Sequence, residues 1–184
     1  MANKKDLKSL VDQYGYSKPI GEKQLISLIR TAVRKQWMMS PTKLSFIESK
    51  KIPETDPNQK KRKHYVICNI CKQHFTVSHT QVDHIVGNIP FTDLSQSLTY
   101  AQSVLNVCHN DLQILCKPCH EIKTYSEKHN ITFKQAKIAK HIIDIFDNKQ
   151  DSQFIINHNQ IPQSNKSKRK QQIYDILCNT VEYQ

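Results

Sequence analysis

Two Cys-x2-Cys pairs constrain the fold of this chain more than any other feature. The first is Cys68-x2-Cys71 and the second is Cys116-x2-Cys119. Together they supply four thiolates, the complete set for a tetrahedral structural zinc that keeps no open position. Such a site contributes folding energy and fixes its two cysteine turns in space, but it cannot activate water. Residues 72–115, between the pairs, exceed the interval of a short zinc ribbon, so this loop should carry something of its own.

The other two cysteines and the apolar content indicate where the protein works. Cys108 and Cys178 lack partners at ligand spacing, so we expect each to be a small apolar side chain. Four of the six cysteines fall into CxxC pairs, which favours metal over a disulfide framework. No apolar leader follows "MANKKDLKSL", and no apolar run approaches the roughly 20 residues that cross a bilayer. We therefore expect a soluble protein of the reducing cytoplasm with no membrane segment.

The chain is strongly basic. Lys and Arg number 27 against 16 Asp and Glu, which gives a formal net charge of +11. The excess gathers in "KKRKH" (60–64) and "NKSKRK" (165–170). Such clusters suit a polyphosphate partner, because each neutralised phosphate releases condensed counterions. A solvated surface is the alternative for either run.

Apolar periodicity predicts helices before the first cysteine pair. Residues 22–40 should form an amphipathic helix that ends at the Ser40-Pro41 break. A second short helix is expected in "TKLSFIES", and the polar, proline-containing stretch 50–63 should be a connector. The expected buried face of the first helix consists of Leu25, Ile29, Ala32, Val33 and Trp37.

Strands are expected around both cysteine pairs. Residues 64–85 should form a strand, the cysteine turn, a second short strand and a third segment that ends at Asp83-His84. A helix within 92–106 should cover this segment from one side, and residues 112–115 are strand-like. A helix should then begin near Pro118, where the missing N–H costs little.

Two further helices are expected towards the carboxy terminus, over 132–148 and over 170–182, whereas 150–170 is polar and poor in helix signals. The expected buried residues are Phe133, Ala136, Ala139, Ile142, Ile143 and Phe146 in the first helix, and Ile173, Ile176 and Leu177 in the second.

Asp83-His84 and His120 form a second constellation within the frame set by the cysteines. His120 directly follows Cys119 at a helix start, while Asp83-His84 ends the segment that follows the first pair. Alone, an Asp-His pair is an ordinary surface or turn feature, and a histidine at a helix start commonly caps or packs. Their position inside a metal-stapled loop of a basic chain favours a functional site.

The ordered pattern "CNIC … VDHI … DLQILCKPCHEIKT" resembles the HNH endonuclease family in its CxxC-zinc version. The matching stretch is 64–126, about a third of the chain, and the flanking "AVRKQWMMSPTKLSFIE" and "HIVGNIPFTDL" resemble small phage-encoded HNH endonucleases. The resemblance implies an α+β fold: a small zinc-stapled, treble-clef-like ββα-metal nuclease core flanked by N- and C-terminal helices.

The resemblance also implies the roles of the second constellation. His84 would be the general base, and Asp83 and His120 would bind one catalytic divalent ion. The residue types suit these roles, because an imidazole with a pKa near about 6.5 takes a proton around neutral pH. A carboxylate and an imidazole can hold a divalent ion and leave positions for water and phosphate. The ion would be Mg²⁺ or Mn²⁺, with Ni²⁺ and Zn²⁺ as alternatives.

The chain departs from the family pattern at the central Asn, which usually precedes the Leu of the L-Q-x-L-C run. Here that position is Asp111, and the nearest Asn is Asn110. In the family this residue ties the loop and orients the base. Asp can share that task as an acceptor but not as an amide donor. Either Asp111 or a shifted Asn110 fills the role, or Asp111 simply caps a turn.

Contacts to nucleic acid are expected mainly with its backbone. The expected contact residues come from the connector, the first helix and the helix after the second cysteine pair: Lys60, Lys61, Arg62, Lys63, Arg30, Arg34 and Lys123. Three histidines outside the motif positions are rival ligands or bases: His64, His79 and His109.

The sequence therefore predicts a metal-dependent DNA endonuclease, in the host cytoplasm if phage-encoded. One active site would nick, and a homodimer could cut both strands. The expected organisation is a helical extension with a basic connector (1–63), the HNH core with its following helix (64–148), and a polar basic tail with a terminal helix (149–184). A non-catalytic, zinc-dependent nucleic-acid-binding module is the alternative. A third hypothesis is an assembly factor that acts with phage packaging machinery.

Overall fold

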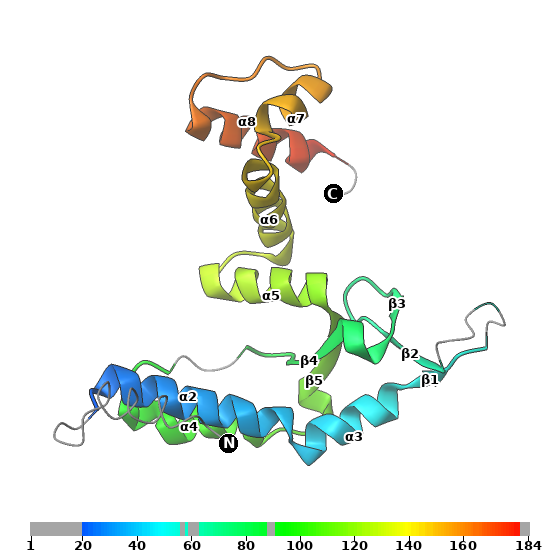
Figure 1. Cartoon of the computed structure of the whole chain (residues 1–184), viewed down its shortest axis with the longest axis vertical. Helices are drawn as coiled ribbons and strands as arrows, with labels where there is room; N and C mark the ends of the chain where they lie inside the picture. Colours follow the sequence, from blue (N-terminus) through cyan, green and yellow to red (C-terminus); the bar gives the residue numbers. More distant parts are fainter. Residues whose placement is uncertain (1–19, 56–57, 59–62, 88–90, 181–184) are drawn as a thin grey trace, which may run out of the picture. The chain divides into compact units, whose positions relative to one another are not determined.

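The computed structural model describes residues 20–55, 58, 63–87 and 91–180 (Figure 1). They form an α+β protein with small antiparallel sheets, which confirms the fold class at that level. The chain divides into two compact units: unit 1 comprises Met1–Ile67 and Val82–Ile114, and unit 2 comprises Cys68–Gln81 and Leu115–Gln184. Within the described residues, every helix is too short or too polar to cross a bilayer. The three-part organisation expected from the sequence stays a prediction.

The first two helices of unit 1 are α2 (Glu22–Met38) and α3 (Pro41–Lys50), and the predicted break between them is confirmed. Pro41 is the first residue of α3, a position where its missing N–H costs little. α2 buries Ile26 and Trp37. Ala32 is exposed, so the expected buried face is wrong at that position. Ile26 is buried in its place, because a larger apolar side chain gains more free energy from burial than alanine does.

Short strands and one more helix complete unit 1. β1 pairs antiparallel with β2, with Ile52 opposite Tyr65, and β4 and β5 form a second, two-stranded sheet. The predicted helix within 92–106 is confirmed as α4, which packs against α2 (Figure 1). In chain order the elements that lie wholly or mainly in unit 1 are β1 (Ile52–Pro53), β2 (His64–Ile67), β4 (Thr80–His84), η2 (Leu94–Gln96), α4 (Ser97–Leu105), η3 (His109–Asp111) and β5 (Leu112–Cys116).

The core of unit 1 gathers side chains from nearly all of these elements. Phe91 stacks on Tyr100 with 5.0 Å between ring centroids, which fixes the segment before α4 to that helix. The buried apolar residues include Phe46, Val66, Phe91, Tyr100, Val104, Leu112 and Ile114. Because Val104 and Leu112 belong to this core, the elements on either side of η3 are held firmly.

Unit 2 combines the cysteine turns with helices. In chain order its elements are β3 (His74–Phe75), η1 (Val77–His79), α5 (Lys117–His129), α6 (Phe133–Asp147), α7 (Asp151–Asn157) and α8 (Lys166–Asn179). β5 leads without a break into α5, as Figure 1 shows. α5 ends at Asn130, which adopts the left-handed conformation (φ 50°) that commonly closes a helix.

The predicted helix over 132–148 is confirmed as α6, and its start follows from the sequence. Thr132 accepts from the Gln135 N–H at 3.2 Å, and the Gln135 side chain accepts from the Thr132 N–H at 2.9 Å, which forms a capping box. Its buried face is only partly as expected, because Ile143 is 37% exposed. Ile138 and Ile145 are buried instead, since α6 packs against both α5 and α8.

The last predicted helix is confirmed as α8, and it docks against α6 and α7. Their shared core consists of Ile138, Ile142, Ile145, Ile155, Ile173, Ile176 and Leu177. The expectation that 150–170 lacks helix is wrong, because α7 lies there. Arg169 donates to the Asp151 carboxylate at 2.6 Å and to two backbone carbonyls at 2.8 Å. This residue of the second basic run therefore holds α8 to α7.

Candidate functional site

The four cysteines of the CxxC pairs come together in unit 2. The Sγ atoms of Cys68, Cys71, Cys116 and Cys119 all lie within 4.8 Å of one another, and those of Cys71 and Cys116 are 3.9 Å apart. Tetrahedral zinc with Zn–S bonds of about 2.3 Å needs sulfurs about 3.8 Å apart. The sulfur positions fit such an ion, so this cluster can bind a structural metal such as zinc.

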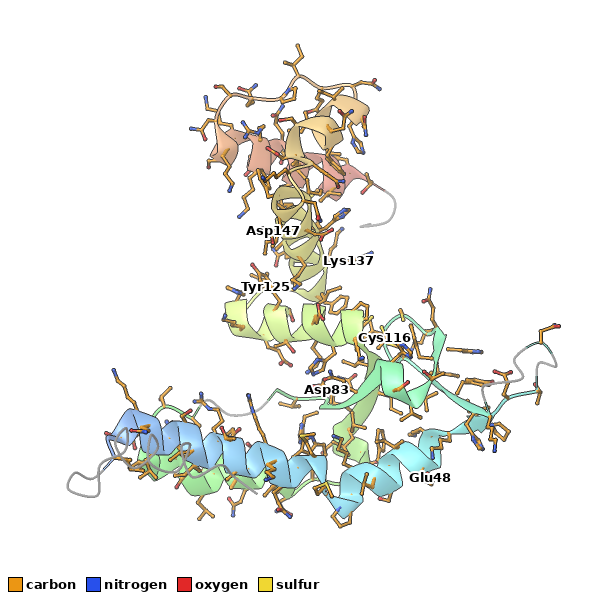
Figure 2. The ribbon with its side chains drawn as sticks, viewed as in Figure 1. Glu48, Asp83, Cys116, Tyr125, Lys137 and Asp147 are labelled. Atoms are coloured by element: carbon orange, nitrogen blue, oxygen red, sulfur yellow. The ribbon has the colours of Figure 1, made fainter. Side chains whose placement is uncertain are left out.

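Local backbone geometry explains how each cysteine turn presents its sulfurs. In the first turn, the Lys72 N–H donates to the Cys68 carbonyl at 3.0 Å, with Lys72 in the left-handed region (φ 60°). In the second, Cys116, labelled in Figure 2, is the N-cap of α5. Pro118 stands in the first turn of that helix. The Cys116 N–H also donates to Cys68 Sγ at 3.3 Å, which joins the two turns.

The thiol pKa values differ within the cluster. Burial raises the pKa of Cys68, but N–H donors from Cys116, Cys71 and Ile70 outweigh it and bring that pKa to about 7. Burial raises the pKa of Cys116, and it raises that of Cys119 together with the neighbouring sulfurs. A cation would relieve this repulsion, since thiolates are the form that binds metal. Ile70, Phe75, Leu115 and Phe133 pack against the buried cysteines of the cluster, whereas Cys71 is exposed.

His84 lies at the end of β4 in unit 1 and is only 7% exposed. Its Nε2 lies 3.1 Å from the carbonyl oxygen of Val104 on α4. A carbonyl can only accept, so Nε2 carries the proton, and the neutral ring then has its lone pair on Nδ1. The ring of Trp37, from α2, lies 4.7 Å away at 40° and supports it.

Asp83 precedes His84 and is partly buried at the β4–β5 sheet (Figure 2). Its Oδ2 accepts from Gln113 Nε2, on β5, at 3.0 Å. Because successive strand residues face opposite sides, Asp83 and His84 point to different faces of the sheet. Asp83 and His84 are thus consecutive residues whose side chains are each oriented by a hydrogen bond.

Asp111 links the segment after His84 to η3. Its carbonyl oxygen accepts from the Ile85 N–H at 2.8 Å, and its carboxylate accepts from the Cys108 N–H at 2.8 Å. The second bond is the main reason why the pKa of Asp111 lies below its usual value, with a smaller contribution from His84. Asp111 thus caps a turn with its side chain and anchors Ile85 with its backbone. Asn110 is exposed beside it.

His120 lies in the first turn of α5 and is partly buried. It belongs to unit 2, whereas Asp83 and His84 belong to unit 1. Its role as a partner of Asp83 stays a prediction of the resemblance.

A pocket of about 390 Å³ opens beside His84 within unit 1. One wall follows β4 and consists of His84, Ile85, Val86 and Gly87. The other wall runs from the end of α4 to η3 and consists of Ser103, Asn106, Val107, Asn110 and Asp111. His84 is therefore part of the lining of this pocket.

The residues expected to contact nucleic acid have varied surroundings. Arg30 donates to the Phe91 carbonyl, with its guanidinium carbon 5.9 Å from the Phe91 ring centroid, and Lys123 pairs with Glu127 on α5. Arg34 and Lys63 are exposed, while Lys60, Lys61 and Arg62 lie outside the described residues.

The rival histidines have their own positions. His109 Nε2 lies 2.9 Å from Ser45 Oγ, which itself donates to the Thr42 carbonyl, so His109 joins η3 to α3. His79 Nδ1 lies 2.7 Å from Thr76 Oγ1 within η1 and its N-cap. His64 is exposed on β2.

Two residues that shape the surroundings of His84 carried no signal for that role. Trp37 was expected to be buried, but periodicity cannot say which side chain it meets. The carbonyl of Val104 could not be predicted, because every residue has one.

No protein-family model, curated protein or solved structure matches this chain.

Proposed function

We propose that this chain is a metal-dependent endonuclease of the HNH type that hydrolyses phosphodiester bonds in DNA. The observation that carries the proposal is the orientation of His84. Its Nε2–H is held by the Val104 carbonyl at 3.1 Å, and its ring lines a pocket. This is the arrangement that a general base requires, since one nitrogen is fixed as donor and the other has the lone pair.

The order of elements supports the same proposal. β4 ends in Asp83-His84, β5 follows, and α5 begins with the second cysteine turn and His120. A ββα-metal nuclease needs this order of strand, strand and helix. The four-cysteine cluster would hold the structural zinc of the CxxC version, and the distances between its sulfur atoms suit that ion.

The chemistry assigned to His84 is a single proton transfer coupled to displacement. His84 Nδ1 takes a proton from water as the water oxygen forms a bond to phosphorus. The bond from phosphorus to the 3′ oxygen breaks, and that oxygen takes a proton from a solvent water, which leaves 5′-phosphate and 3′-hydroxyl ends. Nε2 keeps its proton and donates it to the Val104 carbonyl, and this hydrogen bond holds the ring in its alignment.

Asp83 is the proposed ligand of the catalytic ion in unit 1, and the family resemblance assigns the same role to His120. A divalent ion held by Asp83 would stabilise the negative charge that develops on the phosphate and on the leaving oxygen. Gln113 orients the Asp83 carboxylate through its 3.0 Å hydrogen bond and would keep that ligand in place.

The test is nicking of supercoiled plasmid in Mg²⁺ and in Mn²⁺ by the native chain, His84→Gln and His158→Ala. Gln can still donate to the Val104 carbonyl but is not a base, so the rate should fall at least about a hundredfold. His158 is exposed on unit 2 and serves as the histidine control. Zinc content is measured for all three proteins and should be equal.

The alternative is a zinc-dependent module that binds nucleic acid without cleaving it. It would be favoured if the native chain binds DNA but leaves plasmid intact with every divalent ion. Equal nicking by the native chain and His84→Gln would instead contradict the assigned role of His84.

A further inference from the structure

The charge of the pocket beside His84 is unusual for a protein as basic as this one. Its described lining contains neither Lys nor Arg, and it contains one carboxylate, Asp111. The pKa of that carboxyl lies below its usual value, so it is ionised at neutral pH. A phosphate would be repelled from this wall. A neutral ligand group is therefore the better occupant, although His84 itself must meet a phosphodiester.

The pocket lining combines exposed aliphatic groups with amides. Ile85 and Val86 directly follow the buried His84 and are 50% and 82% exposed. Two such side chains in sequence have no role in the core of unit 1. The lining also includes Asn106 and Asn110, whose side chains carry carboxamides. A volume of about 390 Å³ falls in the range of small-molecule sites and exceeds what a phosphate group needs.

A nucleobase has the properties that this lining selects. It is neutral and flat, its faces pack on aliphatic side chains, and its edge carries both donors and acceptors. A carboxamide offers both as well. We propose that the pocket receives an unstacked base next to the phosphodiester under attack, and that Asn106 and Asn110 read its edge. This inference rests on the proposed endonuclease function and specifies its substrate.

The inference defines the substrate as unpaired nucleic acid. A base inside a duplex is stacked and paired, so it reaches a side pocket only after it leaves the stack. Single strands and mismatched bubbles avoid that cost. A carboxamide pairs in bidentate fashion with adenine, and Asp111 can accept from an exocyclic amino group. Adenine should therefore be preferred over thymine, which lacks that group.

The experiment compares oligonucleotides of one sequence as a single strand, as a mismatch bubble and as a full duplex, with adenine or thymine at each position in turn. Cleavage rates are measured with Mg²⁺ or Mn²⁺. Affinities are measured by fluorescence anisotropy without an added divalent ion. The proteins are the native chain, His84→Gln, Asn106→Ala, Val86→Asp and Gln102→Ala.

The native chain should cleave and bind unpaired substrates at least about tenfold better than the duplex, with about tenfold preference for adenine. Asn106→Ala should lose most of that preference and still cleave the thymine substrate. Val86→Asp, at a side chain that is 82% exposed, should weaken binding through a second carboxylate. Gln102→Ala changes an amide on α4, one turn before its C-cap Asn106 and outside the pocket lining, and should behave as the native chain.

Two results would overturn the inference and leave the endonuclease proposal standing. One is His84-dependent cleavage at equal rates on paired and unpaired substrates. The other is an unchanged adenine preference in Asn106→Ala. Absence of cleavage of every substrate by the native chain would overturn both proposals. Circular dichroism and zinc content of each variant identify a folding defect, and Val86→Asp provides the test if Asn106→Ala fails to fold.

Discussion

The four-cysteine cluster of unit 2 and the surroundings of His84 in unit 1 differ in the kind of group that forms them. The cluster is made of side chains, which lie within 4.8 Å of one another at their sulfurs. His84 is held by a backbone carbonyl on α4 and an indole from α2. A side-chain site can be found from the spacing of letters in a sequence. A site held by the backbone depends on the whole fold of its unit.

The largest effect is expected where the cluster itself is broken. Cys119→Ser should lose the metal and unfold the cysteine turns, because a structural zinc contributes on the order of 10 kcal/mol in favourable cases. Zinc content by mass spectrometry and thermal unfolding measure this. Cys178→Ser is the matched control, since Cys178 lies outside the cluster and only partly buried against the α6–α8 core. Equal zinc content in the native chain and Cys119→Ser would contradict the metal assignment.

Trp37→Ala should give a smaller effect that stays within unit 1. Trp37 is 9% exposed, and truncation of a buried Trp costs about 3 kcal/mol or more. Zinc content should not change, because the cysteines belong to unit 2. Denaturant unfolding measures the loss of stability, and the NMR signals of the His84 ring report the loss of its neighbour. The comparison between the two regions would fail if Trp37→Ala released zinc.

The smallest effect is expected at Asp111, and it depends on pH. The pKa of this carboxyl is lower in the folded protein than its ordinary value of 3.8, mainly because the Cys108 N–H donates to it. Its contribution to stability is therefore present above the unfolded pKa and is lost as pH falls through the folded pKa. Carboxyl NMR titration should place the folded pKa below 3.8.

Asp111→Asn provides the control for that titration. The variant should lose this part of the acid dependence and otherwise unfold much like the native chain, because the bond from Ile85 to residue 111 uses only backbone atoms. A folded pKa at or above the ordinary value would contradict the assigned hydrogen bond.

The sequence predicted elements best where short-range chemistry decides them. The break at Pro41, the helix over 132–148 and the four-cysteine cluster all follow from local rules. α7 was missed because it depends on residues distant in sequence. Ile155 is buried against α8, and Asp151 pairs with Arg169. The buried residues that pack with Ile155 lie outside 150–170, on α6 and on the later part of α8.

The candidate active site shows the same division. His84 and Asp83 could be identified from the sequence pattern, but the partners that orient them could not. Gln113 reads as an ordinary strand residue, and its hydrogen bond to Asp83 needs the register of β4 against β5. The exposure of Ile85 and Val86 also depends on how the strand ends, since both read as core residues.

The bond from the Ile85 N–H to the Asp111 carbonyl has a consequence for how such proteins can diverge. An atom of the main chain accepts this bond, so the side chain at position 111 can be exchanged over generations while the strand end beside His84 keeps its attachment. A residue other than the expected Asn at position 111 is therefore weak evidence that the protein has lost its function. Homologues that differ here from one another are expected to retain the same loop.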